Sequence, residues 1–176
     1  MNKKKLVACI CEGSAERAIV NKLLDEDKLI FNRDNMLDNK VLKCRKAKDF
    51  EDRYLGKSFS EPISVYRVLD SRRERFAIGK LYKHKVKVVN VVTAPEIEIL
   101  IIINEGKFQD YQKHKSYMMP SDYCKQVLGF KNVKNYSFVT NYFEDSNILL
   151  SAIKKYRRKS KVKKGELCLN DIIKEY

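Results

Sequence analysis

The sequence contains few of the residues and patterns that are typical of flexible linkers or membrane spans. Of its 176 residues only 6 are glycine and 3 are proline, and it has no tryptophan. Because glycine and proline are common in long irregular connections, we expect no such connection in this chain. Even the isoleucine-rich run 97–103 is interrupted by Glu98, so it is too short and too polar to cross a bilayer. We therefore expect no membrane helix and no membrane partner.

Cysteine is present without the spacing of a metal site. The five cysteines are an odd number and none belongs to a C-x-x-C pair, which disfavours a disulfide scaffold and a structural zinc site. Cys9 and Cys11 lie two apart in an apolar run, where both side chains face one side of a strand and pack as small apolar groups. Such free cysteines indicate a reducing compartment. Since the apolar run after Lys3–Lys5 is also too short for a signal peptide, we expect a cytoplasmic protein.

Several catalytic motifs are absent. The chain has two histidines, His84 and His114, and each is flanked by lysines, which indicates exposed positions. No Ser-His-Asp or Cys-His arrangement is apparent. The phosphate loop G-x-x-x-x-G-K is missing too, so nucleotide hydrolysis would need a partner chain.

The charge of the chain is strongly unbalanced. It has 37 basic and 23 acidic residues, which gives a formal net charge of +14. A surplus of this size indicates a polyanionic partner, and nucleic acid is the first candidate because lysine and arginine displace counterions from its phosphates. An anionic membrane is disfavoured, since we find no basic helix with a continuous apolar face and no lipidation signal. The alternative is a solvated basic surface without a partner.

Apolar runs separated by helix-like segments predict an α/β fold with a mostly parallel sheet flanked by helices. Residues 5–11, 63–69 and 86–92 are apolar or rich in β-branched residues, which indicates three inner strands. A helix is expected from Ser14, assigned as its N-cap, and a crossover helix over 73–82.

The remaining elements are predicted to be short. We expect an edge strand at 41–44, a helix near 50–54 closing at Gly56, a helix after the capping box Thr93–Glu96, a helix over 122–128, a strand at 138–140, a helix capped by Ser146 and a last turn at 170–176. The helix from Ser146 has an apolar stripe of Ile148, Leu149, Ala152, Ile153 and Tyr156. We expect a single domain over residues 1–176, with a basic helical C-terminal segment at 146–176.

Two carboxylates directly follow predicted strands. Glu12 stands between the first strand and Gly13, and Asp70 follows the second strand. The carboxyl ends of parallel strands meet at one edge of a sheet, where open α/β sheets place their chemistry. Carboxylate oxygens suit Mg²⁺ or Mn²⁺, and such an ion polarises a phosphodiester and lowers the pKa of bound water. The pattern predicts Glu12 and Asp70 as catalytic and metal-binding residues, although any two strand ends could each carry an acid.

These two motifs, together with the later segment Pro95–Glu98, resemble the Toprim fold of topoisomerases, primases and overcoming-lysogeny-defect nucleases. Within that group the chain is most similar to RloB-like and abortive-infection proteins of bacterial defence and restriction-linked loci, over most of its length in the order of elements. The resemblance implies a Toprim-like, Rossmann-like sheet and a glutamate, here Glu12, that acts as general acid/base or metal ligand. It also implies a D-x-D pair that binds Mg²⁺, and a glutamate that follows a proline near the site, which Glu98 matches better than Glu96.

The chain departs from the family at the D-x-D motif. It has Asp70-Ser71-Arg72 there, so the second aspartate is replaced by arginine. Either Glu74 or Glu16 then completes the metal site, or the site is weakened or non-catalytic. Glu98 has the alternative of an ordinary carboxylate on a helix surface.

Two clusters of basic residues are candidates for nucleic-acid binding. The first, Arg72, Arg73 and Arg75, follows Asp70, and guanidinium groups suit phosphate recognition. Its alternative is internal pairing with acids such as Glu74. The second is a block with no acid: Lys154, Lys155, Arg157, Arg158, Lys159, Lys161, Lys163 and Lys164. We expect this block to contact phosphates without reading bases, and its alternative is a solvated helix end.

The sequence therefore predicts a cytoplasmic, Mg²⁺-dependent enzyme of the nuclease type that acts on DNA or RNA phosphodiesters, in phage defence or a restriction-linked locus. The alternative is a nucleic-acid-binding or adaptor module that retains the fold without turnover. A third possibility is a subunit of a defence complex whose site is completed by a partner ATPase.

Overall fold

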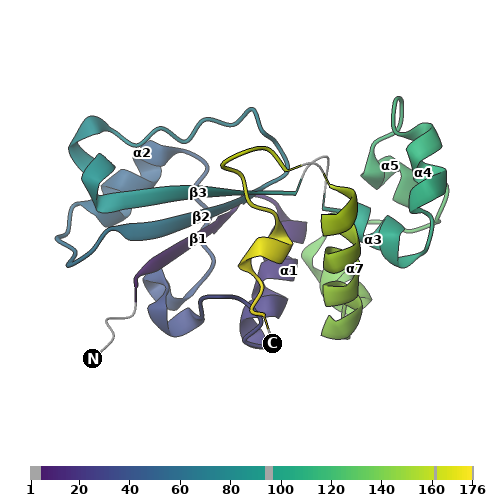
Figure 1. Cartoon of the computed structure of the whole chain (residues 1–176), viewed down its shortest axis with the longest axis horizontal. Coiled ribbons are helices and arrows are strands. Elements are labelled where there is room, and N and C mark those ends of the chain that lie inside the picture. The colour runs from purple at the N-terminus through teal and green to yellow at the C-terminus, as the bar shows by residue number, and fades with distance from the viewer. Residues whose placement is uncertain (1–4, 94–96, 161, 176) are drawn as a thin grey trace.

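The computed structural model describes residues 5–93, 97–160 and 162–175 (Figure 1). Within these ranges, three parallel strands form a sheet in the order β1, β2, β3, and helices flank it. The strands are β1 (Val7–Cys11), β2 (Ile63–Leu69) and β3 (Val86–Val92). The α-helices are α1 (Ser14–Asp25), α2 (Ala47–Phe50), α3 (Ile99–Asn104), α4 (Phe108–His114), α5 (Pro120–Gln126), α6 (Tyr136–Tyr142) and α7 (Ser146–Lys159). Shorter turns are of the 3₁₀ type at Arg33–Asn35, Leu37–Asn39, Lys80–Lys85 and Leu169–Ile172, and of the π type at Glu51–Leu55. The α/β class, the parallel sheet and the three predicted strands are confirmed.

Strands β1 and β2 are buried on both faces because different helices cover each face, whereas β3 is fully buried only at Val91 and Val92. Successive side chains of a strand point to opposite faces. Cys9 of β1 accordingly packs in one core cluster with Ile19 of α1, and Ile10 packs in a second cluster with Phe50 of α2. This two-sided burial explains why the strand sequences do not alternate between apolar and polar residues.

Isolated backbone bridges cover both edges of the sheet, at Met36 and Leu42 beside β1 and at Leu167 beside β3. At the β1 edge the Leu42 amide donates to the Cys9 carbonyl at 2.8 Å, and at the β3 edge the Val92 amide donates to the Leu167 carbonyl at 2.7 Å. The predicted strand at 41–44 is therefore reduced to one bridge at Leu42. Covered edges of this kind protect a sheet from pairing with other chains.

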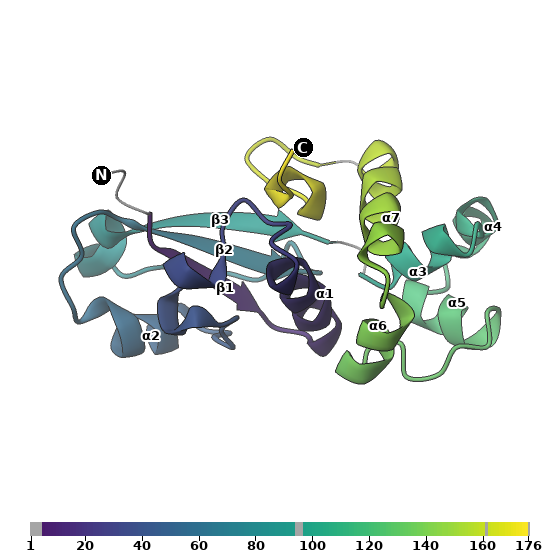
Figure 2. The ribbon, with the colours of Figure 1, turned by 90° about the horizontal axis from the view of Figure 1, so that it is seen from below.

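Helices α3 to α7 lie beyond the carboxyl ends of the strands (Figures 1 and 2). The isoleucine run confirms the predicted helix: it forms α3, whose residues Ile99 to Ile103 are buried against α7 and α5. In α7 the apolar stripe is confirmed except at Ile148, which is 37% exposed, whereas Leu149 is fully buried. No described helix combines the length and the apolar character that a membrane span requires.

The predicted crossover helix over 73–82 is wrong. The chain from 73 to 79 is irregular, and the 3₁₀ helix Lys80–Lys85 leads into β3. The Gly79 amide donates to Glu51 Oε1 at 2.6 Å, and the Phe76 ring lies 4.5 Å from the Arg67 guanidinium. Tertiary contacts have replaced local helical hydrogen bonds, since helix propensity is only a weak preference.

The predicted strand at 138–140 is also wrong, because these residues lie in α6. Phe138 and Tyr142, one helical turn apart, stack with ring centroids 5.9 Å apart. Val139 is the buried residue of this helix. Burial of one helical face has overridden the β propensity of the segment.

The helix starts differ from the predicted caps by one residue. Ser14 and Ser146 are the first helical residues, and the N-cap positions belong to Gly13 and Asp145. The Asp145 side chain accepts a hydrogen bond from the Asn147 amide at 2.8 Å, which satisfies a free donor of the first turn.

The C-terminal segment and the segment before α3 differ from their predicted structures. The helical C-terminal segment stops at Lys159, and the last turn is the 3₁₀ helix Leu169–Ile172. Residues 94–96 of the predicted capping box lie outside the described residues. The Thr93 hydroxyl donates to the Leu69 carbonyl of β2 at 3.2 Å, so it binds the sheet.

Candidate functional site

A cleft of about 330 Å³ opens where β1 and β2 end. Charged residues from three loops and from α1 line it: Glu12, Glu16, Lys43, Arg45, Asp70 and Glu74. Because parallel strands bring their carboxyl ends to the same edge, the loops after β1 and β2 meet here. The structure thus brings Glu12, Asp70 and Glu74 to one cleft, as the sequence predicted.

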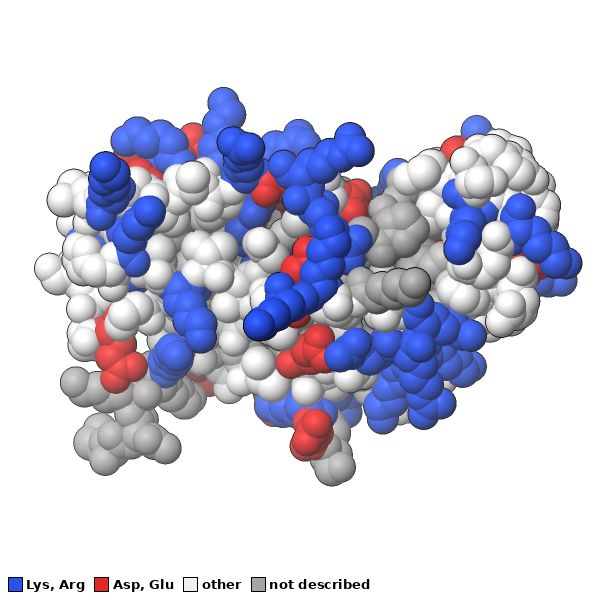
Figure 3. Space-filling view, turned by 45° about the horizontal axis from the view of Figure 1, so that its top comes forward, with Lys and Arg blue, Asp and Glu red and all other residues white. Residues whose placement is uncertain are grey.

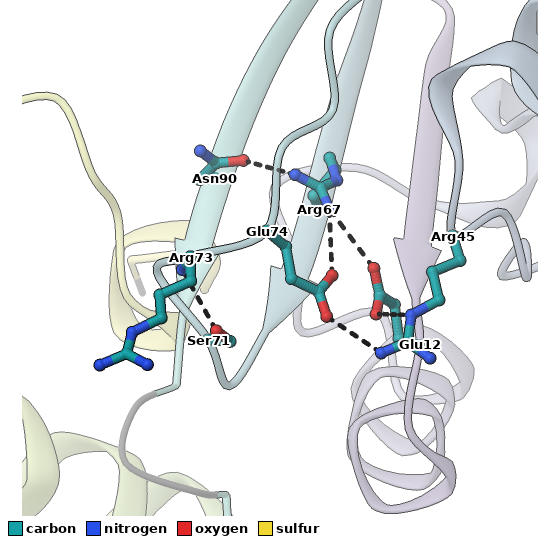
Figure 4. Close-up of polar contacts among 7 residues, drawn as sticks. All are labelled: Glu12, Arg45, Arg67, Ser71, Arg73, Glu74 and Asn90. Carbon is teal, nitrogen blue, oxygen red and sulfur yellow. Dashed lines mark hydrogen bonds and ion pairs between the residues drawn. The ribbon is translucent and has the colours of Figure 1, made fainter.

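Glu12 and Glu74 are held between two arginines (Figure 4). Arg67 Nη2 lies 3.4 Å from Glu12 Oε1 and 3.6 Å from Glu74 Oε2. From the other side, Arg45 Nε lies 3.4 Å from Glu12 Oε2, and Arg45 Nη2 lies 3.3 Å from Glu74 Oε1. Each carboxylate oxygen therefore has a guanidinium partner, and the four side chains form a closed ring of ion pairs.

Arg67 is a buried cation in the middle of β2, with 2% of its surface exposed. Its Nη1 donates to Asn90 Oδ1 of β3 at 3.5 Å, and its guanidinium lies over the Phe76 ring. Burial lowers the pKa of Arg67, and the nearby charges of Glu12 and Glu74 raise it. Because a buried charge is costly unless it is paired, Arg67 holds the two carboxylates in place.

The two carboxylates of the ring titrate differently. Burial raises the pKa of Glu12 to about 7. The hydrogen bond and the negative charge of Glu74 also raise this pKa, whereas the positive charges of Arg67 and Arg45 lower it. The same hydrogen bond lowers the pKa of Glu74, and Arg45 lowers it further. The pair thus shares one proton near neutral pH, with Glu12 as its carrier. A carboxyl group with this pKa can give or take a proton at neutral pH.

A side chain at position 13, directly after Glu12, would clash with its surroundings, so this position requires glycine. A Cβ at Gly13 would overlap the Glu16 carboxylate, which is 6% exposed and packs over the start of α1. A carboxylate in this place also interacts favourably with the amino end of the helix dipole. Gly13 therefore lets Glu16 close over the turn that carries Glu12.

Magnesium, which the Toprim resemblance implies, can be tested against these donors. The described residues contain no group of three His, Cys, Asp or Glu side chains placed to hold a metal ion. The oxygens of Glu12 and Glu74 face Arg67 and Arg45, and Arg67 is buried in the sheet. These residues do not fit a resident Mg²⁺, and the metal site remains a prediction without structural support.

The other two predicted metal ligands lie in different surroundings. Asp70 is exposed and lines the cleft. Glu98 is 4% exposed at the N-cap of α3 and does not line the cleft, so the structure does not bring it to Glu12. The alternative interpretation of Glu98 as a surface carboxylate is wrong, because its side chain is buried.

The three arginines after β2 are exposed and do not line the cleft. Arg72 Nε lies 3.0 Å from Glu166 Oε2, which ties this loop to the C-terminal segment. The Arg73 guanidinium points away from Glu12 and Glu74 in Figure 4. Internal pairing with an acid thus occurs at Arg72, but its partner is Glu166.

The polar face of α7 carries most of the second basic cluster. Its last two turns expose Lys154, Lys155, Arg157, Arg158 and Lys159. Figure 3 shows lysine and arginine side chains gathered in a patch over this end of the helix. A groove of about 520 Å³ runs between α7 and the C-terminal segment, with Lys154, Arg157, Arg158 and Lys174 in its wall. Lys161 lies outside the described residues.

Sequence reasoning missed Arg67 and Arg45. Arg67 left a signal, because a single arginine interrupts the apolar run 63–69, and an inward-facing cation needs a partner. Arg45 left none, since it follows Cys44 in an irregular segment and its role depends on where that segment passes Glu12 and Glu74.

Comparisons with protein-family models, curated proteins and solved structures found no match for this chain.

Proposed function

We propose that this chain binds the phosphate backbone of nucleic acid through the basic face of α7 and the groove beside it. The observation that carries this proposal is the group of exposed cations Lys154, Lys155 and Arg158, for which no ion pair occurs among the described residues. Arg157 is the exception, because its Nε lies 3.3 Å from Asp171 Oδ1. Uncompensated cations on one helix face release counterions from phosphates and bind without reading the base sequence.

Charge neutralisation on α7 tests this proposal. We expect the double variant Lys154→Gln/Arg158→Gln to bind a labelled oligonucleotide more weakly and to lower the slope of log affinity against log salt by about 1 for each phosphate that the protein no longer neutralises. The matched control is Lys80→Gln/Lys125→Gln, which removes the same charge from exposed positions elsewhere. Equal losses of affinity in both double variants would show that net charge alone governs binding, and the α7 assignment would then fail.

Phosphodiester cleavage at the cleft is a second candidate function, favoured by the position and proton affinity of Glu12. As a proton carrier at neutral pH, Glu12 would act as general acid or base, and Lys43 and Arg45 on the same wall would meet phosphate oxygens. This is the chemistry that a Toprim-like fold implies, and we propose that fold for the sheet. Mg²⁺, if the substrate brings it, would supply charge neutralisation at the phosphate.

A cleavage assay on single- and double-stranded DNA and RNA tests this second candidate, with EDTA in one arm and Mg²⁺ or Mn²⁺ in the other. We expect cleavage to fall by about 100-fold or more in Glu12→Gln, in line with the loss of a general acid or base. Glu61→Gln, at an exposed position outside the cleft, is the control. If Glu12→Gln retains full activity, the cleft is not catalytic.

The partner ATPase remains a prediction. Copurification of the tagged chain from its native cells tests it, and recovery without any ATPase subunit would argue against a shared site.

A further inference from the structure

A second groove, of about 530 Å³, lies between α4 and the carboxyl-terminal end of α7. Its apolar part comes from α3, α4 and the turn before α5 and includes Ile99, Phe108, Tyr111 and Met119. Its volume is within the range of pockets that hold small molecules. The groove is separate from the cleft at Glu12 and from the groove that carries Arg158.

The charges around this groove are all of one sign. Its wall contains three cations, Arg72, Lys115 and Lys159, and no carboxylate. Arg72 is paired with Glu166, while Lys115 donates to Gln112 at 2.7 Å and remains exposed, as does Lys159. An apolar floor with a cationic rim suits a ligand that combines a flat apolar part with a phosphate.

The Phe108 ring is accessible from the solvent side. The Lys159 ammonium lies 4.8 Å from its centroid, and both side chains belong to residues that are at least partly exposed. A planar group that approaches from solvent can replace this ammonium on the ring face, and the long lysine stem lets the charge turn toward a neighbouring phosphate.

The groove also adjoins the surface to which we assign backbone binding. Lys159 is in the last turn of α7, four residues after Lys155, so these two cations lie on the same side of the helix. Arg72 comes two residues after Asp70 of the cleft and lines this groove together with Tyr156 of α7. A strand bound along Lys155 and Lys159 would reach the mouth of this groove.

We infer that this groove receives one unstacked base of single-stranded nucleic acid, which stacks on Phe108 while its phosphate contacts Lys159 and Lys115. This inference rests on the proposed function and adds a strand preference to it. A base in a duplex is stacked and paired, so it cannot enter, whereas a base in a single strand turns out of the backbone at low cost.

Binding measured by fluorescence anisotropy tests the inference with three probes: oligothymidylate, an abasic strand of the same length, and a duplex of the same length. We expect oligothymidylate to bind more tightly than the abasic strand. The variant Phe108→Ala should weaken oligothymidylate binding by about 5- to 100-fold, the weight of one base–aromatic stack, and leave the other two probes unchanged.

A second variant covers the case in which Phe108→Ala does not fold. Met119 is 47% exposed, so Met119→Glu places a negative charge at the groove without disturbing the core. It should also weaken binding of oligothymidylate. Tyr117→Ala is the control, because Tyr117 is an aromatic residue that is 71% exposed outside the groove, and it should bind like the unaltered chain.

The outcomes distinguish base insertion in the groove from backbone binding on α7. Equal binding of oligothymidylate and the abasic strand, unchanged by Met119→Glu, overturns base insertion and leaves backbone binding on α7 intact. Failure of the unaltered chain to bind any of the three probes overturns both.

Discussion

The cleft at the sheet edge and the basic face of α7 are both rich in charge, but they differ in how that charge is balanced. In the cleft, the buried Arg67 and the exposed Arg45 pair with Glu12 and Glu74, so the charge is balanced by the protein itself. On α7, Lys154, Lys155 and Arg158 are exposed and have no ion pair among the described residues, so a ligand or salt balances their charge. Burial explains the difference: an unpaired charge is costly inside a fold and nearly free at its surface.

This comparison predicts that the same charge removal has opposite consequences in the two regions. Charge in the cleft should matter for the free energy of unfolding and for cleavage there, and little for the affinity of a polyanion bound at α7. Charge on α7 should matter for binding and little for folding.

Removal of Arg67 should have the largest effect. We expect Arg67→Met to lower the free energy of unfolding by about 3–5 kcal/mol, because two half-buried carboxylates lose their buried partner. Arg45→Met should cost at most about 1 kcal/mol, since the Arg45 side chain is 78% exposed. Denaturant unfolding of both variants measures this. Similar losses of unfolding free energy in the two variants would mean that burial does not determine how much each arginine stabilises the fold.

The buried side of α7 should also contribute to stability. Leu149→Ala should cost about 3 kcal/mol, because Leu149 is fully buried and its truncation leaves a cavity. Ile148→Ala is the matched control at the neighbouring position and should cost about 0.5 kcal/mol or less, since Ile148 is 37% exposed. Thermal unfolding distinguishes the two. A large destabilisation at Ile148 would contradict the orientation of α7.

The stability of the cleft should depend on pH through Glu12. Its pKa rises from 4.5 to about 7 on folding, so the folded state holds a proton that the unfolded state releases. This contribution is present below the unfolded value and is lost as pH rises through about 7. Glu74 has the opposite sign: its pKa is lowered, so its contribution is present at neutral pH and is lost in acid.

The variant Glu12→Gln isolates the first of these two effects. Between about pH 5 and about pH 8 the unaltered chain should lose on the order of 1–2 kcal/mol, and Glu12→Gln should lose less, since its amide does not titrate. Unfolding curves across this range provide the measurement. An identical pH profile in the variant would remove the assignment of the proton to Glu12.

The smallest effect on stability should come from α7. Lys154→Gln/Arg158→Gln should change the free energy of unfolding by about 0.5 kcal/mol or less, because both side chains are exposed. Denaturant unfolding of the same preparation used for binding is the check. A large destabilisation would mean that weakened binding reflects partial unfolding and not the removal of two positive charges.

Much of the sheet could be predicted from sequence because its strands are locally encoded. Ile63–Leu69 and Val86–Val92 are rich in β-branched residues, which favour a strand over a helix. The segment 73–79 could not be predicted, because its conformation depends on Glu51 and Arg45, which lie far away in the chain, and on the buried Arg67 of β2. Helix α6 was missed because its aromatic stack forms only in the helical state.

In the candidate site, too, the sequence predicts what depends on local segments and not what depends on distant residues. Glu12 and Asp70 could be assigned to one edge, since parallel strands always bring their carboxyl ends together. The partners of Glu12 could not, because ion pairs depend on side-chain distance and not on sequence separation. Glu98, assigned to the site by resemblance, is buried at the start of α3 and does not line the cleft.

By itself the sequence determined the α/β class, the three strands, the place of Glu12 at the end of the first strand and the positive surface of α7. These depend on local composition, on strand direction and on net charge, which are properties of short segments or of the whole chain. Only the tertiary structure decided that Arg67 and Arg45 enclose Glu12 and Glu74, and that a groove with an apolar floor lies beside Lys159. Both depend on which distant segments share the interior, where the cost of an unpaired charge selects the partners of each buried group.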